Sequence, residues 1–238
     1  MLAMLFLSGI VACARNEAPQ RRSNSSSSVD HLVIKEVFYI GHVVTKSFPE
    51  EWGLAPVKSW YEDDQYISIY NPTSEVKYLD GHALCTTALD PSDERTFAGK
   101  EDFRRKYIGV EAISYFPGSG KEHPIQPGQT VVIANYAEEP EDPKRYKGVD
   151  DLLDLTKADW EWTHSDYDKQ GMNNPNVPDL VPILTGVDSK GKKYSDFAIK
   201  QLSGQNGIVL IQLPWTPEDF RENYQDTKER PGYRHYIN

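Results

Sequence analysis

Residues 65–73 have the sequence Gln-Tyr-Ile-Ser-Ile-Tyr-Asn-Pro-Thr, and this stretch decides the fold. Ile67 and Ile69 alternate with polar or amphipathic side chains, which is the pattern of a strand with one face on a core. Asn71 and Pro72 then favour a turn, because Asn bonds to its own backbone and Pro has the φ that a turn needs. The stretch therefore predicts a strand that ends in a tight turn.

Short apolar runs of the same kind lie on both sides of it. Residues 32–40 are rich in β-branched and aromatic side chains, and residues 130–134 form a continuous apolar run. Turn signals stand at residues 80–81 and 127–128. Further strands are predicted at residues 76–79, 82–86, 197–202 and 207–213, the last two as a hairpin. Many short strands joined by Gly, Pro and Asn turns predict an antiparallel β-sandwich or barrel.

The N-terminus has the features of an exported lipoprotein. Residues 2–11 form an apolar run, which is too short for a membrane span of about 20 residues. Small residues then precede Cys13, as in a bacterial lipoprotein cleavage box. We therefore expect cleavage before Cys13 and lipid on its thiol. No Lys or Arg precedes the run, so an ordinary secretory signal or a frayed apolar terminus is the alternative.

A Ser-rich tether of about 20 Å r.m.s. span is expected after the lipidated Cys. A short helix is predicted to begin at Thr216, because Thr is a good N-cap and Pro217 suits the first helical position. No closing strand is predicted in residues 233–238, which is consistent with a longer chain. The expected organisation is signal peptide 1–12, lipidated Cys and tether 13–29, folded domain 30–213 with an insertion at about 135–194, and C-terminal helix and tail 214–238.

Composition narrows the possible partners. The chain has 238 residues and a net charge of -10, with 26 basic against 36 acidic residues. Binding to a phosphate backbone depends on Lys and Arg, so no nucleic-acid partner is expected. Of the 2 cysteines, a lipidated Cys13 would leave Cys85 without a disulfide partner. Cys85 lies among apolar residues and is predicted to be a small buried hydrophobe.

The insertion holds a partial calcium motif. Asp166, Asp168 and Gln170 place oxygen atoms at alternate positions, and Gly171 stands where the sharp turn of a calcium loop is needed. The twelfth position is Val177, where a bidentate Glu belongs. Calcium is thus a candidate cofactor at these three oxygen donors, and a solvated Asp-rich loop is the alternative.

An enzyme is not expected. His164 lies two residues from Asp166, and such a pair can act as a general base. However, no Ser or Cys nucleophile lies in a recognisable motif. A hydrolase that uses the Asp/His-rich insertion is therefore the least favoured function.

Large aromatic side chains gather in the insertion and in residues 45–64, which are predicted to be a loop. Trp and Tyr are frequent hot-spot residues in interfaces, and such rings can also stack on sugars. Trp160 and Trp162 are two apart in an extended stretch, so they share one face and favour packing onto the sandwich. The candidate partner- or ligand-binding residues are Trp52, Trp60, Tyr61, Trp160, Trp162 and Tyr167.

Several motifs occur in the order found in lamin-tail domains. Residues 33–37 and 65–73 resemble the opening strand of that family and its E-[IL]-Y-N-P-T strand and turn. Residues 78–84 resemble the D-L-S-G-W-x-L step, and residues 127–134 resemble the P-G-x-x-[VL]-[VL]-[IL]-A strand. Ser68 replaces the usual acidic residue. The resemblance implies an immunoglobulin-like β-sandwich (lamin-tail-like) with no catalytic residues.

Residues 154–162 and 174–180 resemble a narrower group of uncharacterised outer-membrane lipoproteins of Bacteroidota-type bacteria, classed as a domain of unknown function. Its members are often encoded near TonB-dependent transporters. The resemblance implies a non-catalytic lipoprotein, held on either face of the outer membrane by lipid on Cys13. It would act as a binding or accessory module for such a transporter or for a surface glycan or peptide ligand. A structural or adhesive surface protein is the alternative.

Overall fold

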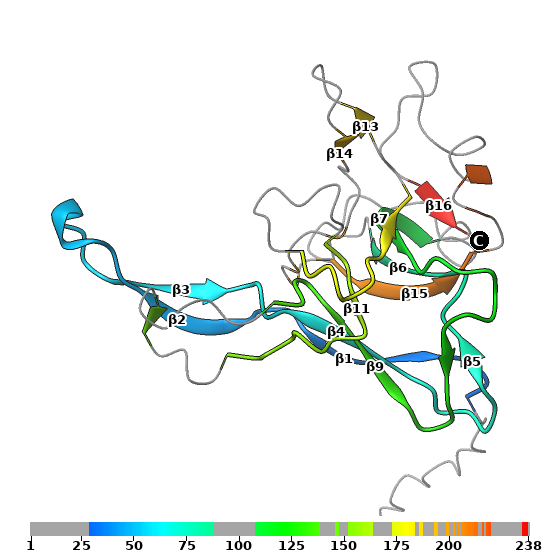
Figure 1. Ribbon diagram of the computed structural model, residues 1–238. Coiled ribbons are helices and arrows are strands. Elements are labelled where there is room, and N and C mark those ends of the chain that lie inside the picture. The colour runs from blue at the N-terminus through cyan, green and yellow to red at the C-terminus, as the bar shows by residue number, and fades with distance from the viewer. Residues whose placement is uncertain are drawn as a thin grey trace, which may run out of the picture.

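The fold is built almost entirely of β-strands and turns. The structure, a computed structural model, describes residues 29–87, 108–138, 146–147, 152–163, 173–183, 186–187, 193–194, 199, 202, 204, 206–213, 216, 218–219 and 235–237. Two sheets form the body of the molecule (Figure 1). The first has the order β1-β4-β9-β11, with β1 Val33–Phe38, β4 Tyr66–Tyr70, β9 Thr130–Ala134 and β11 Trp160–Glu161. The second has the order β12-β7-β6-β15, with β12 Val181–Pro182, β7 Ile108–Tyr115, β6 His82–Thr87 and β15 Ile208–Gln212, and with β16 His235–Ile237 paired to β7.

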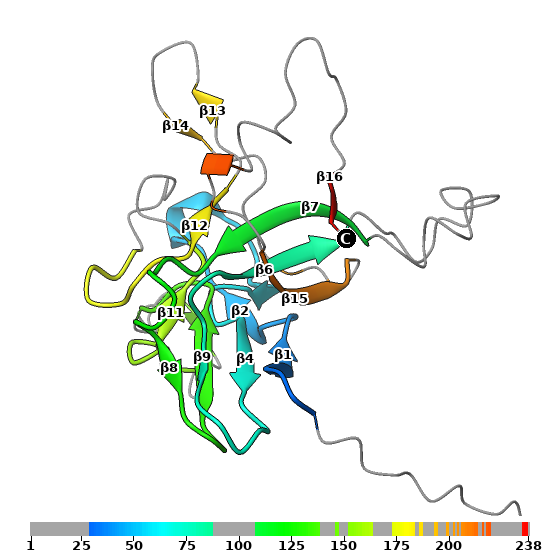
Figure 2. The same cartoon turned by 90° about the vertical axis from the view of Figure 1, so that its right-hand side faces the viewer.

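The main core lies between the two sheets. Ile67 and Ile69 of β4 and Ile133 of β9 point inward and are completely buried. Leu84 of β6 meets them from the second sheet, and the strands of the two sheets run in different directions (Figure 2). The prediction of an all-β sandwich is thus confirmed.

The outer faces of both sheets are also apolar. Val132 and Ala134 point away from the main core and are covered by Leu155 and Val177 from the insertion. In the second sheet, Cys85 belongs to another apolar cluster on the face opposite Leu84. This double burial explains why residues 130–134 are a continuous apolar run. It also shows that the described parts of the insertion are packed, as expected.

The insertion closes one edge of the sandwich. β11 runs parallel to β9, with Trp160 opposite Ile133. The chain then returns, and β12 pairs with β7 of the second sheet. The insertion therefore bridges the two sheets instead of extending from them.

Smaller elements complete the fold. β2 (His42–Lys46) and β3 (Val57–Tyr61) form an antiparallel hairpin that projects from the body, with β10 (Tyr146–Lys147) beside β2 and the 3-10 turn η1 (Glu50–Trp52) at its tip (Figure 1). The prediction of a loop over residues 45–64 is therefore wrong at β3. Two short pairs remain, formed by β5 (Lys77–Tyr78) with β8 (Pro124–Ile125) and by β13 (Gly186–Val187) with β14 (Lys193–Tyr194).

The C-terminal predictions have mixed outcomes. β15 forms as expected, but it pairs with β6, and of its predicted hairpin partner only Ile199 and Leu202 are described, neither in a strand. Thr216 caps as predicted, because its Oγ accepts the Asp219 N–H at 3.1 Å. The expectation of no closing strand is wrong, since β16 pairs with β7.

Candidate functional site

The projecting hairpin, residues 42–61, is called the arm below. Its tip is a single 3-10 turn that begins after Pro49 and ends at Gly53, which has φ +61°. The Gly53 N–H donates to the Glu50 carbonyl at 3.0 Å and closes the turn. Phe48 packs against one side of Trp52, with ring centroids 6.2 Å apart. Trp52 remains 61% exposed, so the tip presents an indole to solvent.

The stem of the arm presents a second indole. Trp60 lies opposite Val43 in the β2–β3 register, and cross-strand partners share a face. Trp60 is 55% exposed and Val43 is also exposed, whereas Val44 on the other face is buried. The face of the stem that carries Val43 and Trp60 is therefore open to solvent, and Val57 on the other face is exposed as well.

The base of the arm is fixed to the body. Gly41 has φ +75°, and a Cβ there would lie 1.9 Å from the Tyr61 carbonyl oxygen, so only Gly fits. The buried Asp64 carboxylate accepts from the His42 imidazole at 2.5 Å and from the His42 N–H at 3.3 Å. Tyr61 is buried at this base, so it positions the arm and is not part of its open surface.

Two further aromatic candidates, Trp160 and Trp162, lie in the body of the molecule and not in the arm. Trp160 and Trp162 are buried in the main core, in agreement with the packing interpretation, and they offer no exposed ring to a partner. Cys85 is completely buried, as predicted, and burial raises the pKa of its thiol. This thiol is therefore not poised as a nucleophile.

A buried carboxylate joins the segments of the insertion. Glu161 accepts from the Ala137 N–H at 2.9 Å, from the Asn174 N–H at 3.1 Å and from the Asn173 side-chain amide at 2.8 Å. The same Asn173 amide donates to the Asp179 carboxylate at 2.8 Å. Burial, together with the nearby Asp179 charge, raises the pKa of Glu161 to about 8. The Glu161 carboxyl group therefore keeps its proton at neutral pH.

The raised pKa of Glu161 predicts that stability falls as the pH rises from 4.5 to about 8. The folded chain keeps on Glu161 a proton that the unfolded chain releases near the ordinary pKa of 4.5. The stabilising contribution is complete below that value and is lost as the pH rises through about 8. One such proton changes the free energy of unfolding by up to about 1.4 kcal/mol per pH unit. Urea unfolding at a series of pH values between 5 and about 9 measures this slope.

Asp179→Asn isolates the contribution of the pair. The substitution removes the negative charge next to Glu161, which is one of the causes that raise the pKa of Glu161. Desolvation of Glu161 remains, so we expect a smaller loss of stability that ends at lower pH. An unchanged slope in Asp179→Asn would show that other groups cause it.

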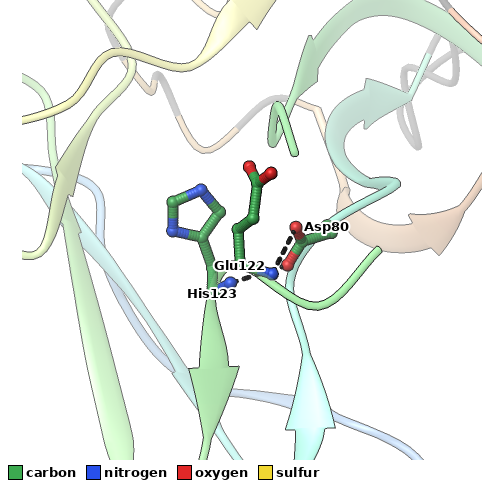
Figure 3. A group of neighbouring side chains, drawn as sticks. All are labelled: Asp80, Glu122 and His123. Atoms are coloured by element: carbon green, nitrogen blue, oxygen red, sulfur yellow. Dashed lines mark hydrogen bonds between the residues drawn. The ribbon is translucent and has the colours of Figure 1, made fainter. Parts of the chain in front are cut away.

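A second polar cluster lies at the loop that directly precedes β8. The buried Asp80 carboxylate accepts backbone N–H bonds from Glu122 at 2.9 Å and His123 at 2.8 Å (Figure 3), and a third from Gly120 at 3.2 Å. Burial alone would raise the pKa of Asp80, but these hydrogen bonds outweigh it and hold the pKa below its ordinary value. Gly118 permits the close approach, since a Cβ there would lie 2.0 Å from the Asp80 Oδ1. Asp80 thus fixes the loop that carries the Glu122 and His123 side chains.

A cavity of about 250 Å³ adjoins this loop. Glu122, His123 and Asp159 supply its ionisable groups, and Trp160 lies beside them. The His123 and Trp160 rings meet edge to face, with centroids 4.7 Å apart. The sequence predicts the turn at residues 80–81 but gives no sign of this cluster, because its members meet only through the fold.

Other predictions fall outside the described residues. They concern the lipidated Cys13, the candidate ring Tyr167, the possible base His164 and the calcium candidates Asp166, Asp168 and Gln170. These stay predictions. Among the described residues, no helix is both long and apolar enough to span a bilayer.

Comparisons with known proteins bear on the fold alone. No protein-family model matches the chain, and no curated protein matches it. The fold is similar to the crystal structure of a DUF4876 family protein from Bacteroides thetaiotaomicron VPI-5482, with a TM-score of 0.51 and 22% sequence identity. The match covers 77% of this chain but 43% of that chain, so this chain spans less than half of its neighbour. This similarity is consistent with the predicted resemblance to an uncharacterised Bacteroidota domain of unknown function. The lipoprotein and lamin-tail assignments stay predictions.

Proposed function

We propose that this chain is a non-catalytic cell-envelope lipoprotein, an accessory module at the outer membrane that binds a protein partner through the arm. The observation that carries the proposal is the pair of exposed indoles, Trp52 at the tip and Trp60 on the stem. Exposed large apolar groups that cluster on a projecting element mark interaction sites. Trp is also the residue type most enriched among interface hot spots.

The construction of the arm supports this use. Its base is locked by Gly41 and by the contact between His42 and Asp64, so its open face is presented in a fixed orientation. A rigid surface loses less conformational entropy on binding than a flexible one. β3 also lies at the edge of its small sheet as far as the described residues extend. An extended segment of a partner could therefore add to that edge.

The position of the arm fits an anchored module. The described chain starts on the side of the body opposite the arm tip (Figure 1). If lipid on Cys13 holds the chain by a tether of about 20 Å, the tip points away from the anchor. A TonB-dependent transporter is the partner that the sequence resemblance suggests, and a surface glycan or peptide ligand is the other outcome of the test.

Crosslinking in intact cells tests this proposal. A photo-reactive residue at Leu54, which is exposed and lies between Trp52 and Trp60 in the sequence, should capture a transporter barrel from the full-length chain. Trp52→Ala and Trp60→Ala should each weaken capture, because a hot-spot Trp contributes about 2 kcal/mol or more. That is roughly a 30-fold change in Kd. The readout is the yield of the crosslinked band, with its protein identified by mass spectrometry.

Val76→Ala is the matched control, since Val76 is an exposed apolar side chain outside the arm. Its capture yield should equal that of the wild type. All three variants should keep their thermal stability, because exposed substitutions usually change it by less than about 0.5 kcal/mol. Undiminished capture in a Trp52→Ala/Trp60→Ala double variant would exclude the arm as the binding surface.

A further inference from the structure

The geometry points to a binding site for a divalent transition-metal ion, such as Zn²⁺, formed by Asp80, Glu122 and His123. This site lies on the body of the molecule and shares no residue with the arm. The inference therefore goes beyond the proposed function and does not depend on it.

The three side chains converge. Asp80, Glu122 and His123 each offer one potential ligand atom, and these three atoms all lie within 4.8 Å of one another (Figure 3). Zinc bonds to N and O ligands are about 2.0–2.2 Å long and point to the corners of a tetrahedron, so two ligand atoms of one ion are about 3.4 Å apart. Glu122 is exposed, so its carboxylate can rotate to close the remaining gap.

Two of the ligands are held in place before any ion binds. Asp80 is fixed by its three backbone hydrogen bonds. Two of them go to Oδ1, and Oδ2 accepts the third, from the His123 N–H. A carboxylate has about four acceptor positions, so Oδ2 keeps one for a cation. The His123 ring rests against Trp160, which in turn meets Phe116 edge to face at 5.3 Å. Metal sites depend on such supporting contacts to orient their ligands.

The donor atoms select the kind of ion. One imidazole nitrogen with two carboxylate oxygens suits Zn²⁺ and similar transition metals, whereas Ca²⁺ and Mg²⁺ prefer oxygen ligands alone. Three protein ligands leave at least one coordination position for water or for an oxygen of a small molecule. The adjoining cavity, with Asp159 and Trp160 in its wall, gives that position room.

Isothermal titration of the metal-free full chain tests the site. Zn²⁺ should bind at a single site per chain, while Ca²⁺ at the same concentration should give no heat from this site. Glu122→Gln and His123→Phe should each weaken Zn²⁺ binding roughly tenfold or more, since even supporting residues around a metal contribute about 10- to 100-fold. His123→Phe retains a ring against Trp160, and neither change removes a backbone donor to Asp80, so both variants should fold.

His31→Phe is the matched control. His31 also has a carboxylate neighbour, Asp30, at 2.8 Å, but both side chains are exposed and no third ligand is grouped with them among the described residues. This variant should bind Zn²⁺ as the wild type does. The inference is overturned if the wild type binds no Zn²⁺, or if circular dichroism shows folded Glu122→Gln and His123→Phe chains with wild-type affinity. Loss of binding in His31→Phe would also overturn it.

Discussion

Trp162→Ala should lower the free energy of unfolding by about 3–5 kcal/mol, the usual cost of removing a buried Trp side chain. Trp162 is completely buried and belongs to the main core, where the other residues of both sheets are already packed. Its backbone N–H bonds to the Ala134 carbonyl at 2.9 Å and holds the segment beside β9, so the cavity cannot simply collapse. For a chain of this size the melting temperature should fall by about 6–20 °C. Urea unfolding followed by far-ultraviolet circular dichroism measures the change.

Two comparisons isolate the cause of this loss. Trp60→Ala removes the same side chain from an exposed position and should change stability by no more than about 0.5 kcal/mol. Trp162→Phe should cost less than Trp162→Ala, because it keeps an aromatic ring and removes an indole N–H that has no hydrogen-bond partner among the described residues. Equal unfolding midpoints for Trp162→Ala and Trp60→Ala would mean that Trp162 is not a core residue.

The opposite positions of these two Trp residues show what local sequence patterns can predict. Ile67 and Ile69 are recognisable as core residues because their alternation is a property of the strand itself. Trp162 is buried because its segment runs beside β9, far away in the sequence. Trp60 lies in a strand that forms by pairing with β2, with one face left open to solvent. The spacing of Trp160 and Trp162 predicts that they pack on one face, but no local pattern shows that Trp60 stays exposed.

β7 shows a second limit. Residues 108–115 were not predicted as a strand, although they form the centre of the second sheet. Ile108, Val110 and Ala112 alternate with Gly109 and Glu111, but Ile113 directly follows Ala112 and breaks the alternation. The β6–β7 register also shifts between Thr86 and Thr87, as a β-bulge does, so strict alternation fails there. Its place in the sheet comes from pairing on both sides.

The cluster around Asp80 could not be predicted for a related reason. The sequence predicts the turn at residues 80–81. The cluster depends on Asp80 accepting N–H groups from a loop about forty residues later in the chain. No local pattern shows which loop a buried carboxylate will hold.

Asp80→Asn should therefore destabilise the chain by about 2–4 kcal/mol at pH 7. Hydrogen bonds to a charged group contribute about 1.5–3 kcal/mol each, and Asn offers one acceptor oxygen where Asp offers two. At least one of the three backbone N–H groups of the loop would face the Asn amide and lose its partner. Urea unfolding gives the global change. Hydrogen exchange should in addition be faster at the Gly120, Glu122 and His123 amides than in the wild type.

The pH dependence of this difference provides an independent check. Because the pKa of Asp80 is held below its ordinary value of 3.8, its contribution is present above that value. It is lost as the pH falls through the lower pKa of the folded chain, so wild type and Asp80→Asn should converge in acid. Asp154→Asn is the control, because Asp154 is exposed and its bonds to the Thr156 N–H and hydroxyl can be made by Asn. If Asp154→Asn and Asp80→Asn had equal stability at pH 7, Asp80 would not be the residue that holds the loop.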